Sequence, residues 1–243
     1  MFRRVSNESQ EVDCIAKCSE CELEFVTPMP SQERLNLFYK NYSDIRAEEE
    51  VLKRNAIRNL KVLNSFGVGI NSTLIDYGSG RNVFVSCGKS MGAKNWRSFD
   101  AYTENSKRDV LSPCHYEAVT TWGVLEHVVN PLEFAIDLVR LLRVDGYLFL
   151  TTVDINSKIP FRYKVPEHVT YWTHSAMKTL FERVNLSMIE YRPYEMEQCR
   201  DVYMNILLRT VPENYKSKVN YEAMPKFVEV PTNEIFVVGK KIA

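Results

Sequence analysis

Residues 73–83, TLIDYGSGRNV, contain a short apolar run, a turn with two glycines and the start of a helix-like stretch. Residues 73–77 predict a buried strand, because short apolar runs bounded by turn residues are typical of strands covered on both faces. Gly78 and Gly80 allow the backbone to bend and to approach a ligand with no Cβ in between. A strand, a glycine turn and a helix in succession predict an α/β sheet.

The same alternation continues on both sides of this turn. Only about sixteen residues separate Asp100 from the next clear strand, so the crossover after the second strand is predicted to be shortened or missing. Residues 195–231 are predicted to form a long polar and aromatic insertion between the last two strands. The predicted strands are 95–100, 117–122, 146–153, 187–194 and 234–241, and the predicted helices start near Ser31, residue 46, Asn82, Pro131 and Thr173.

Composition narrows the classes of function. Among 243 residues, 31 Lys and Arg balance 31 Asp and Glu, whereas nucleic-acid binders usually carry a basic excess. No apolar run approaches the roughly 20 residues of a membrane span, and the N-terminus lacks the apolar region of a secretory signal. The six cysteines are therefore expected to be reduced thiols in a cytoplasmic protein. We expect a cap formed by residues 1–45 and a main domain formed by residues 46–243.

The turn itself indicates the charge of its ligand. It reads D-x-G-x-G rather than the dinucleotide pattern G-x-G-x-x-G, and Asp76 before the glycines would repel a pyrophosphate. Asp100, at the end of the next strand, is placed to accept hydrogen bonds from ribose hydroxyls. These two acids favour a nucleoside that carries a positive group. A plain βα turn and an ordinary strand-end cap are the alternatives.

The segments LIDYGSGRN, WRSFD and YEAVTTWGVLEHVVNPLEFAIDLVRLLRVDGYLFLTT resemble the Rossmann-like methyltransferases that use S-adenosylmethionine, over residues 73–186. The resemblance implies a three-layer α/β/α fold whose mostly parallel sheet ends in an antiparallel strand. It implies that S-adenosylmethionine binds as cofactor and leaves as S-adenosylhomocysteine. The implied donor-site residues are Asp76, which orders the loop, Gly78 and Gly80 beside the methionine part, Asp100 on the ribose, and Thr121, Trp122 and Gly123 along the wall.

Two features depart from this family. Asn82 stands where many members have a third glycine, and the short crossover removes a segment that normally supplies part of the adenine pocket. Tyr102 is our candidate to cover the base and Asp109 our candidate to meet its amino group. A binding module that transfers no methyl group is therefore an alternative function.

Two Glu-His pairs follow the central strands. In some relatives a glutamate three residues before the first pair helps to bind a divalent metal, but Gly123 occupies that position here, so Glu126 and His127 are expected to brace the loop without metal. The second pair lies in PEHVTYWT, residues 166–173, which resembles the E-H-x-x-Y stretch of sugar C-methyltransferases. His168 is the candidate general base, with Glu167 and Tyr171 as catalytic neighbours. A loop pinned by the Glu-His pair and aromatic packing is the alternative.

A cysteine cluster precedes the α/β pattern. Cys14, Cys18 and Cys21 resemble part of the zinc ribbon that precedes some of these methyltransferases, but one knuckle is absent. We expect a small hairpin without bound zinc. The following helix carries Tyr39 and Tyr42, which either pack in the core or touch the ligand.

The predicted function is methyl transfer to a small polar acceptor, with a sugar or sugar nucleotide as the first expectation. An RNA methyltransferase shares the fold, although the zero net charge argues against it. A dinucleotide oxidoreductase is disfavoured by Asp76 and by the incomplete glycine pattern. Nothing in the sequence fixes the oligomeric state.

Overall fold

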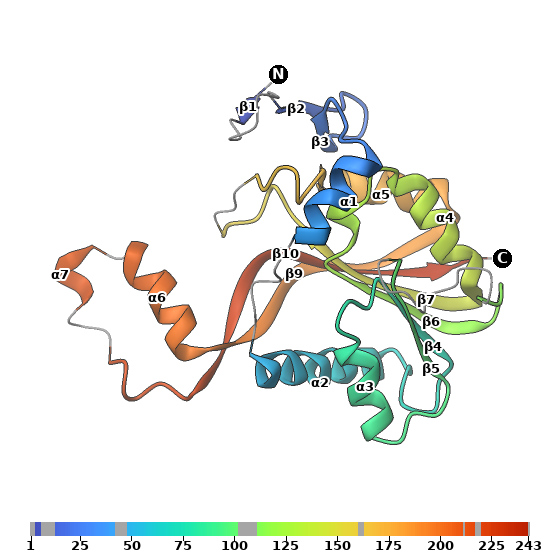
Figure 1. The fold of residues 1–243 in the computed structure, drawn as a ribbon. Coiled ribbons are helices and arrows are strands. Elements are labelled where there is room, and N and C mark those ends of the chain that lie inside the picture. The colour runs from blue at the N-terminus through green and yellow to red at the C-terminus, as the bar shows by residue number, and fades with distance from the viewer. Residues whose placement is uncertain are drawn as a thin grey trace.

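A six-stranded sheet forms the centre of the protein, in the strand order β5-β4-β6-β7-β10-β9 (Figure 1). The computed structural model describes residues 3–5, 13–41, 48–101, 111–159, 163–210, 212–216 and 220–242. The strands of this sheet are β4 (Leu74–Tyr77), β5 (Trp96–Phe99), β6 (Tyr116–Trp122), β7 (Leu142–Val153), β9 (Leu186–Cys199) and β10 (Phe227–Lys241).

Strand directions match the predicted topology. β4 pairs in parallel with β5 and β6, and β6 pairs in parallel with β7. The last strand, β10, runs antiparallel to both β7 and β9. β5 lies at the edge of the sheet, and the described residues between β5 and β6 form no strand or helix, as the short crossover predicted. No helix in the described part of the chain is long and apolar enough to cross a membrane.

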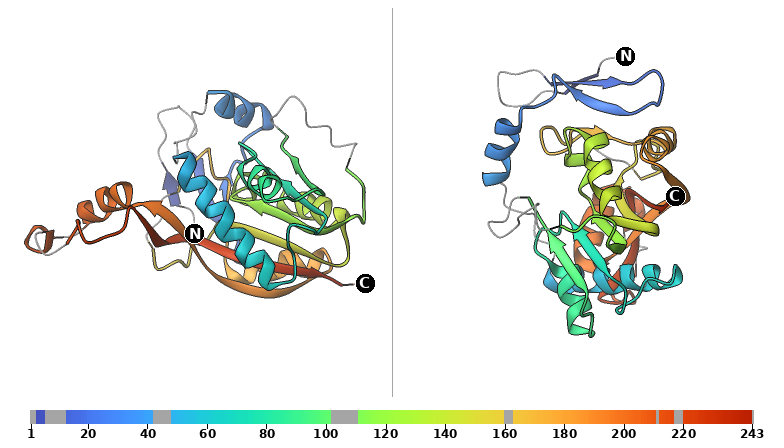
Figure 2. Two further views of the ribbon diagram at one scale, coloured as in Figure 1. Left: turned by 90° about the horizontal axis from the view of Figure 1, so that it is seen from below. Right: turned by 90° about the vertical axis from the view of Figure 1, so that its right-hand side faces the viewer.

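Helices cover both faces of this sheet, which confirms the three-layer prediction (Figures 1 and 2). On one face lie α2 (Glu49–Ser65) and α3 (Val83–Ser90), which pack through Leu60, Leu63 and Phe84. On the other face lie α4 (Pro131–Leu141) and α5 (His174–Arg183).

Local sequence fixes where two of these helices begin. The Asn130 side chain accepts a hydrogen bond from Glu133 N–H, and Pro131 occupies the first turn of α4. The Thr173 side chain caps α5 by accepting from Ala176 N–H. The predicted helix starts at Pro131 and Thr173 are therefore confirmed.

The N-terminal segment forms a second, smaller sheet in the order β1-β2-β3-β8. The predicted hairpin is present as β2 (Asp13–Lys17) antiparallel to β3 (Glu24–Thr27), with β1 (Arg3–Val5) on its outer side. β3 also pairs with β8 (Thr170–Tyr171), which belongs to the loop before α5. The helix α1 (Gln32–Asn41) follows, while Tyr42 and the side chain of Tyr39 lie outside the described residues.

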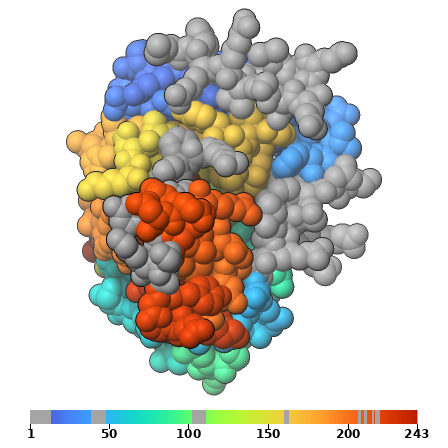
Figure 3. Space-filling view, turned by 90° about the vertical axis from the view of Figure 1, so that its left-hand side faces the viewer, coloured from blue at the N-terminus to red at the C-terminus, as the bar shows by residue number. Residues whose placement is uncertain are grey.

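The predicted insertion 195–231 is wrong at both ends, because β9 continues to Cys199 and β10 already begins at Phe227. The two strands leave the main sheet as a twisted arm that carries α6 (Arg200–Thr210) and α7 (Glu213–Lys216). In Figure 3 this arm, in orange and red, points toward the viewer in front of the rest of the molecule.

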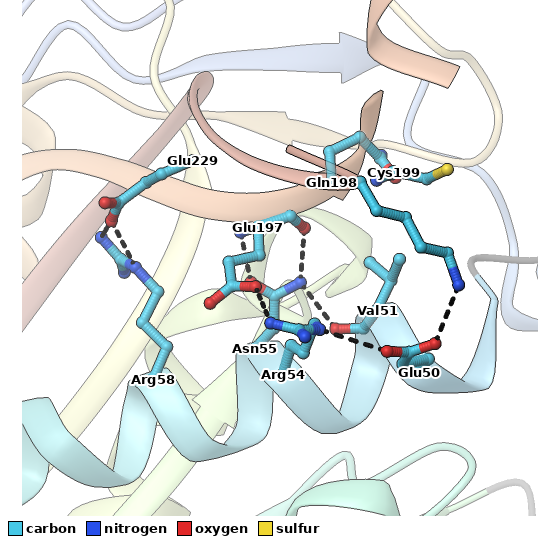
Figure 4. Close-up of polar contacts among 10 residues, drawn as sticks. Glu50, Val51, Arg54, Asn55, Arg58, Glu197, Gln198, Cys199 and Glu229 are labelled. Atoms are coloured by element: carbon cyan, nitrogen blue, oxygen red, sulfur yellow. Dashed lines mark hydrogen bonds and ion pairs between the residues drawn. The ribbon is translucent and has the colours of Figure 1, made fainter. Parts of the chain in front are cut away.

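Helix α2 anchors the base of the arm (Figure 4). The Asn55 amide donates to the carbonyl oxygens of Val51 and Glu197, and its Oδ1 accepts from Glu197 N–H at 2.8 Å. Arg54 and Arg58 add ion pairs to Glu197 and Glu229. The backbone of β9 is thus fixed to α2 by a buried amide, with partly exposed ion pairs around it.

Candidate functional site

A cavity of about 690 Å³ lies at the carboxyl ends of β4, β5 and β6. This edge is where parallel α/β sheets bind their ligands, and the volume suits a small molecule. The described residues of its wall are Gln32, Asn36, Tyr77, Gly78, Asp100, Ala101, Gly123, Val124, His127, Val128, Val129, Asn130, Glu133, Phe134 and Asp137.

The glycine turn after β4 needs its glycines for different reasons. Gly78 has a φ of +80°, and a Cβ built on it would lie 2.6 Å from Val124 Cγ2. Gly80 has a φ of +47° but faces open space. Asn82, which stands in place of a third glycine, adopts a φ of 57°. Asparagine tolerates this left-handed conformation better than most residues, so the departure at residue 82 preserves the turn.

Asp76 lies in β4, two residues before the first glycine of the turn. Its side chain is buried and accepts a hydrogen bond from Thr120 Oγ1 at 2.7 Å, which ties β4 to β6. Burial raises the pKa of Asp76 to about 7, with the hydrogen bond from Thr120 acting in the opposite direction. Asp76 is not among the described residues of the cavity wall.

Asp100 closes the turn from the neighbouring strand. Its Oδ2 accepts a hydrogen bond from Gly80 N–H at 2.8 Å, and Asp100 is also part of the cavity wall. Gly78 and Ser79 donate their N–H groups to Phe99 O. The predicted pair of glycine turn and second-strand acid is therefore assembled at one end of the cavity.

The central strand contributes differently from its predicted residues. Gly123 lines the cavity, and its N–H donates to Thr151 Oγ1. Thr121 is fully buried, and Trp122 packs with Phe84 and Phe236 on the α2 side of the sheet. Of these three predicted donor-site residues, the structure brings only Gly123 into the cavity wall. Tyr102 and Asp109 lie outside the described residues.

Several wall residues were missed from the sequence. Tyr77 packs with Phe99 and Phe134, at ring separations of 4.6 and 5.5 Å, and forms an aromatic floor. Gln32 and Asn36 of α1 line the opposite side. The apolar spacing of Tyr77 and Phe134 reads as ordinary core, so no local signal separates them from packing residues.

The residues of this cavity fit a nucleoside that carries a positive charge. Asp100 places a carboxylate beside the turn, the aromatic floor offers ring surface, and Gly78 keeps the backbone clear of a side chain. The described wall also contains Glu133 and Asp137 but no lysine or arginine. A pyrophosphate would find no cation among these residues.

A Glu-His pair lies at the inner end of the cavity, in the short helix η2 (Leu125–His127). Glu126 is buried and accepts from Thr152 Oγ1 at 2.8 Å, while His127 Nδ1 donates to Glu167 O at 2.7 Å. Burial raises the pKa of Glu126 to about 7 and lowers the pKa of His127. Glu126 and His127 thus join the central strands to the loop before β8.

The second predicted pair lies directly behind the first. The rings of His127 and His168 are 4.8 Å apart and nearly perpendicular. Glu167 Oε1 lies 3.7 Å from His168 Nε2, but burial lowers the pKa of His168 to about 2, so the carboxylate does not raise its basicity as expected. The Tyr171 hydroxyl is buried, donates to His168 O and accepts from Lys164 N–H.

The three N-terminal cysteines do not form a cluster of ligands. Cys14 lies on β2, paired with Thr27, and Cys18 and Cys21 belong to the turn that joins β2 to β3. Backbone hydrogen bonds from Cys21 and Glu20, followed by a hydrogen bond with the Cys21 side chain, hold the pKa of Cys18 below its ordinary value. All six cysteines are free.

Comparison with known proteins defines the class. A family model described as a methyltransferase domain matches residues 40–191, more than half of the 243 residues. The chain therefore belongs to this methyltransferase-domain family, and it is an enzyme of that class. No curated protein matches the chain.

Solved structures agree with this fold. A SAM-dependent methyltransferase from Archaeoglobus fulgidus has a TM-score of 0.53 at 16% identity, over 85% of this chain and 99% of that one. The 1,6-didemethyltoxoflavin-N1-methyltransferase of Burkholderia thailandensis, solved with its acceptor and S-adenosylhomocysteine, has a TM-score of 0.53 at 14% identity, over 99% of both chains. The phosphoethanolamine N-methyltransferase 2 of Haemonchus contortus, with S-adenosylmethionine, has a TM-score of 0.52 at 14% identity, over 77% of this chain and 53% of that one.

Proposed function

We propose that this protein transfers a methyl group from S-adenosylmethionine to a small polar acceptor, with a sugar hydroxyl as the first candidate. One observation carries the proposal: Gly78, Asp100 and Gly123, from three adjacent strand ends, line one cavity, and Asp100 holds the Gly80 N–H. S-adenosylmethionine supplies, when bound, a methyl group on a positively charged sulfur.

The chain's own residues bind and orient the methyl donor. Asp100 accepts hydrogen bonds from the ribose, Gly78 and Gly80 bring backbone close to the methionine part, and Asp76 holds the turn from behind. Methyl transfer needs alignment more than acid or base catalysis, since the donor is already activated. Gln32 and Asn36 from α1 line the same cavity.

The imidazoles of His127 and His168 meet behind the cavity wall, and of the two only His127 lines the cavity. Burial lowers the pKa of His168, the base predicted from the sequence, to about 2, so we do not assign the acceptor's proton to it. Glu167 and Tyr171 position the two imidazoles through the contacts to His127 Nδ1 and His168 O. We therefore assign Glu167 and Tyr171 to positioning rather than to proton transfer.

Charge favours a neutral acceptor over a nucleotide-linked one. The described wall residues include three carboxylates, from Asp100, Glu133 and Asp137, and no lysine or arginine. A sugar diphosphate or an RNA backbone would meet repulsion there. With all six cysteines free, we place the reaction in the cytoplasm.

Calorimetry tests the donor assignment. The proposal requires that S-adenosylmethionine and S-adenosylhomocysteine bind and that a nicotinamide dinucleotide does not. Formation of S-adenosylhomocysteine is then measured with neutral sugars, sugar nucleotides and RNA as acceptors. Binding without turnover on any acceptor would favour a module that only holds the nucleoside, and absence of binding would end the proposal.

A further inference from the structure

Three side chains gather where the cavity ends against the loop before β8. Glu126, His127 and His168 each present one oxygen or nitrogen, and these three atoms lie within 4.8 Å of one another. We infer that this cluster binds a divalent cation. Two imidazoles and one carboxylate suit a first-row transition metal such as Zn²⁺, Mn²⁺ or Co²⁺ and leave other coordination positions open.

His127 is oriented as a ligand. Its Nδ1 donates to the carbonyl oxygen of Glu167 at 2.7 Å, so the proton sits on Nδ1 and the lone pair on Nε2. Metal-binding histidines commonly give their second ring nitrogen to a backbone carbonyl in this way, which fixes both the tautomer and the ring. Because His127 also lines the cavity, an ion held by it is reachable from the cavity.

Glu126 has one carboxylate oxygen available for the ion, while its other oxygen accepts a hydrogen bond. Oε2 accepts from Thr152 Oγ1, and Oε1 lies 3.7 Å from the position that a Cβ on Gly123 would take. The side chain is 2% exposed, and no lysine or arginine of the described residues forms an ion pair with it. A buried carboxylate without a cation is costly, and a metal ion removes that cost.

His168 supplies the third ligand. It is 6% exposed, and its Nδ1 has no hydrogen-bond partner among the described residues. The sequence lacks a carboxylate at residue 123, but the loop before β8 brings an imidazole to the same cluster from forty residues away.

The described residues contain no competing cluster. No other group of three histidine, cysteine or acidic side chains within them comes close enough to share an ion, and this includes the three N-terminal cysteines. The ion's role rests on the proposed function: at the inner end of the donor cavity, it would bind the acceptor's oxygen and lower the pKa of that hydroxyl.

Metal binding is tested apart from activity. The chain has four histidines, so imidazole NMR resolves the site directly. The protein is stripped with chelator and titrated with Zn²⁺ in a Cys18→Ser/Cys21→Ser background, which removes thiol ligands. The inference requires that one equivalent shifts the signals of His127 and His168 and spares those of His115 and His174.

Variants then separate the ligands from the fold. His168→Gln and Glu126→Gln should weaken Zn²⁺ or Co²⁺ binding by more than about ten-fold, with unchanged far-UV circular dichroism. His115→Gln, which changes an exposed histidine outside the cluster, should bind the ion as the parent does. Absence of binding at millimolar ion, or shifts confined to His115 or His174, would overturn the inference.

Donor affinity distinguishes this failure from failure of the proposed function. S-adenosylmethionine binding is measured on the stripped protein. If the donor binds and the ion does not, the metal site falls and the methyltransferase assignment stands. If the ion binds and the donor does not, the metal site stands without its proposed role.

Discussion

Replacing Asp100 with alanine removes the carboxylate that accepts from Gly80 N–H at 2.8 Å and faces the cavity. A hydrogen bond to a charged group contributes about 1.5–3 kcal/mol. At about 1.4 kcal/mol per factor of ten, Asp100→Ala should raise the Kd for S-adenosylmethionine by about 10- to 150-fold. Asp100→Asn keeps an oxygen for Gly80 but loses the charge, so about half of the free-energy change is expected.

The assay is calorimetric titration of each variant with S-adenosylmethionine and S-adenosylhomocysteine. Asp145→Asn is the matched control, because Asp145 is an exposed acid at the start of β7, away from the strand ends that line the cavity. If Asp100→Ala binds both compounds as the parent does, Asp100 does not hold the ribose and the donor site lies elsewhere.

Three further predictions concern the turn, its buried acid and the arm. Gly78→Ala should destabilise the fold by about 1–3 kcal/mol through contact with Val124 and by about 1–2 kcal/mol through its positive φ. Adding Val124→Ala should restore only the part due to the contact, as measured by denaturant titration. If the double variant regains no stability, the contact with Val124 is excluded. Burial raises the pKa of Asp76 to about 7, so the neutral Asp76 stabilises the folded protein fully at low pH, and this stability is lost as the pH rises toward 7. The free energy of unfolding of Asp76→Asn should therefore fall less than that of the parent between about pH 4 and 7. Parallel curves of unfolding free energy against pH would contradict the raised pKa. Asn55→Ala should cost about 1–3 kcal/mol by leaving the Glu197 backbone unpaired, whereas Arg54→Ala should cost less than about 1 kcal/mol; equal urea midpoints for the two variants would refute the buried anchor.

Much of the central sheet could be predicted because its strands carry local signals. The apolar runs at residues 73–77 and 146–153 and the helix starts at Pro131 and Thr173 act within a few residues. The arm could not be predicted in this way. Three of the five residues 195–199 are polar, and the pairing shifts register after Pro231 in the second strand. β9 and β10 persist there through pairing with each other and through Asn55, more than 130 positions away.

The cavity likewise has residues that local sequence predicts and residues that only the tertiary fold brings there. Gly78 and Asp100 were predicted from a turn and a strand end, and both lie in the wall. Strand alternation already indicated that Thr121 and Trp122 could not both face the ligand, because neighbouring residues of a strand point to opposite faces. In the structure Trp122 packs on the α2 side of the sheet. Gln32 and Asn36 reach the cavity only through the path of α1, which no local pattern encodes.

The meeting of His127 and His168 was hidden for a related reason. Each histidine belongs to a recognisable Glu-His pair, but the two pairs are about forty residues apart, and no local pattern links them. Their 4.8 Å approach depends on contacts between the segment before β8 and the short helix η2, including the hydrogen bond from Val169 N–H to Glu126 O. Tertiary contacts of this kind leave no periodicity to detect.

The two-residue strand β8 connects the N-terminal hairpin to the loop that carries Glu167 and His168. Because Phe25 and Glu24 pair with Thr170 and Tyr171, the N-terminal hairpin fixes the height of the loop that carries Glu167 and His168. Under the proposed function, a library randomised at residues 24–25 should change which acceptors are methylated while leaving donor affinity as in the parent. The loop that carries Glu167 and His168 can thus be adjusted from two hairpin residues that lie more than 140 positions before it in the sequence.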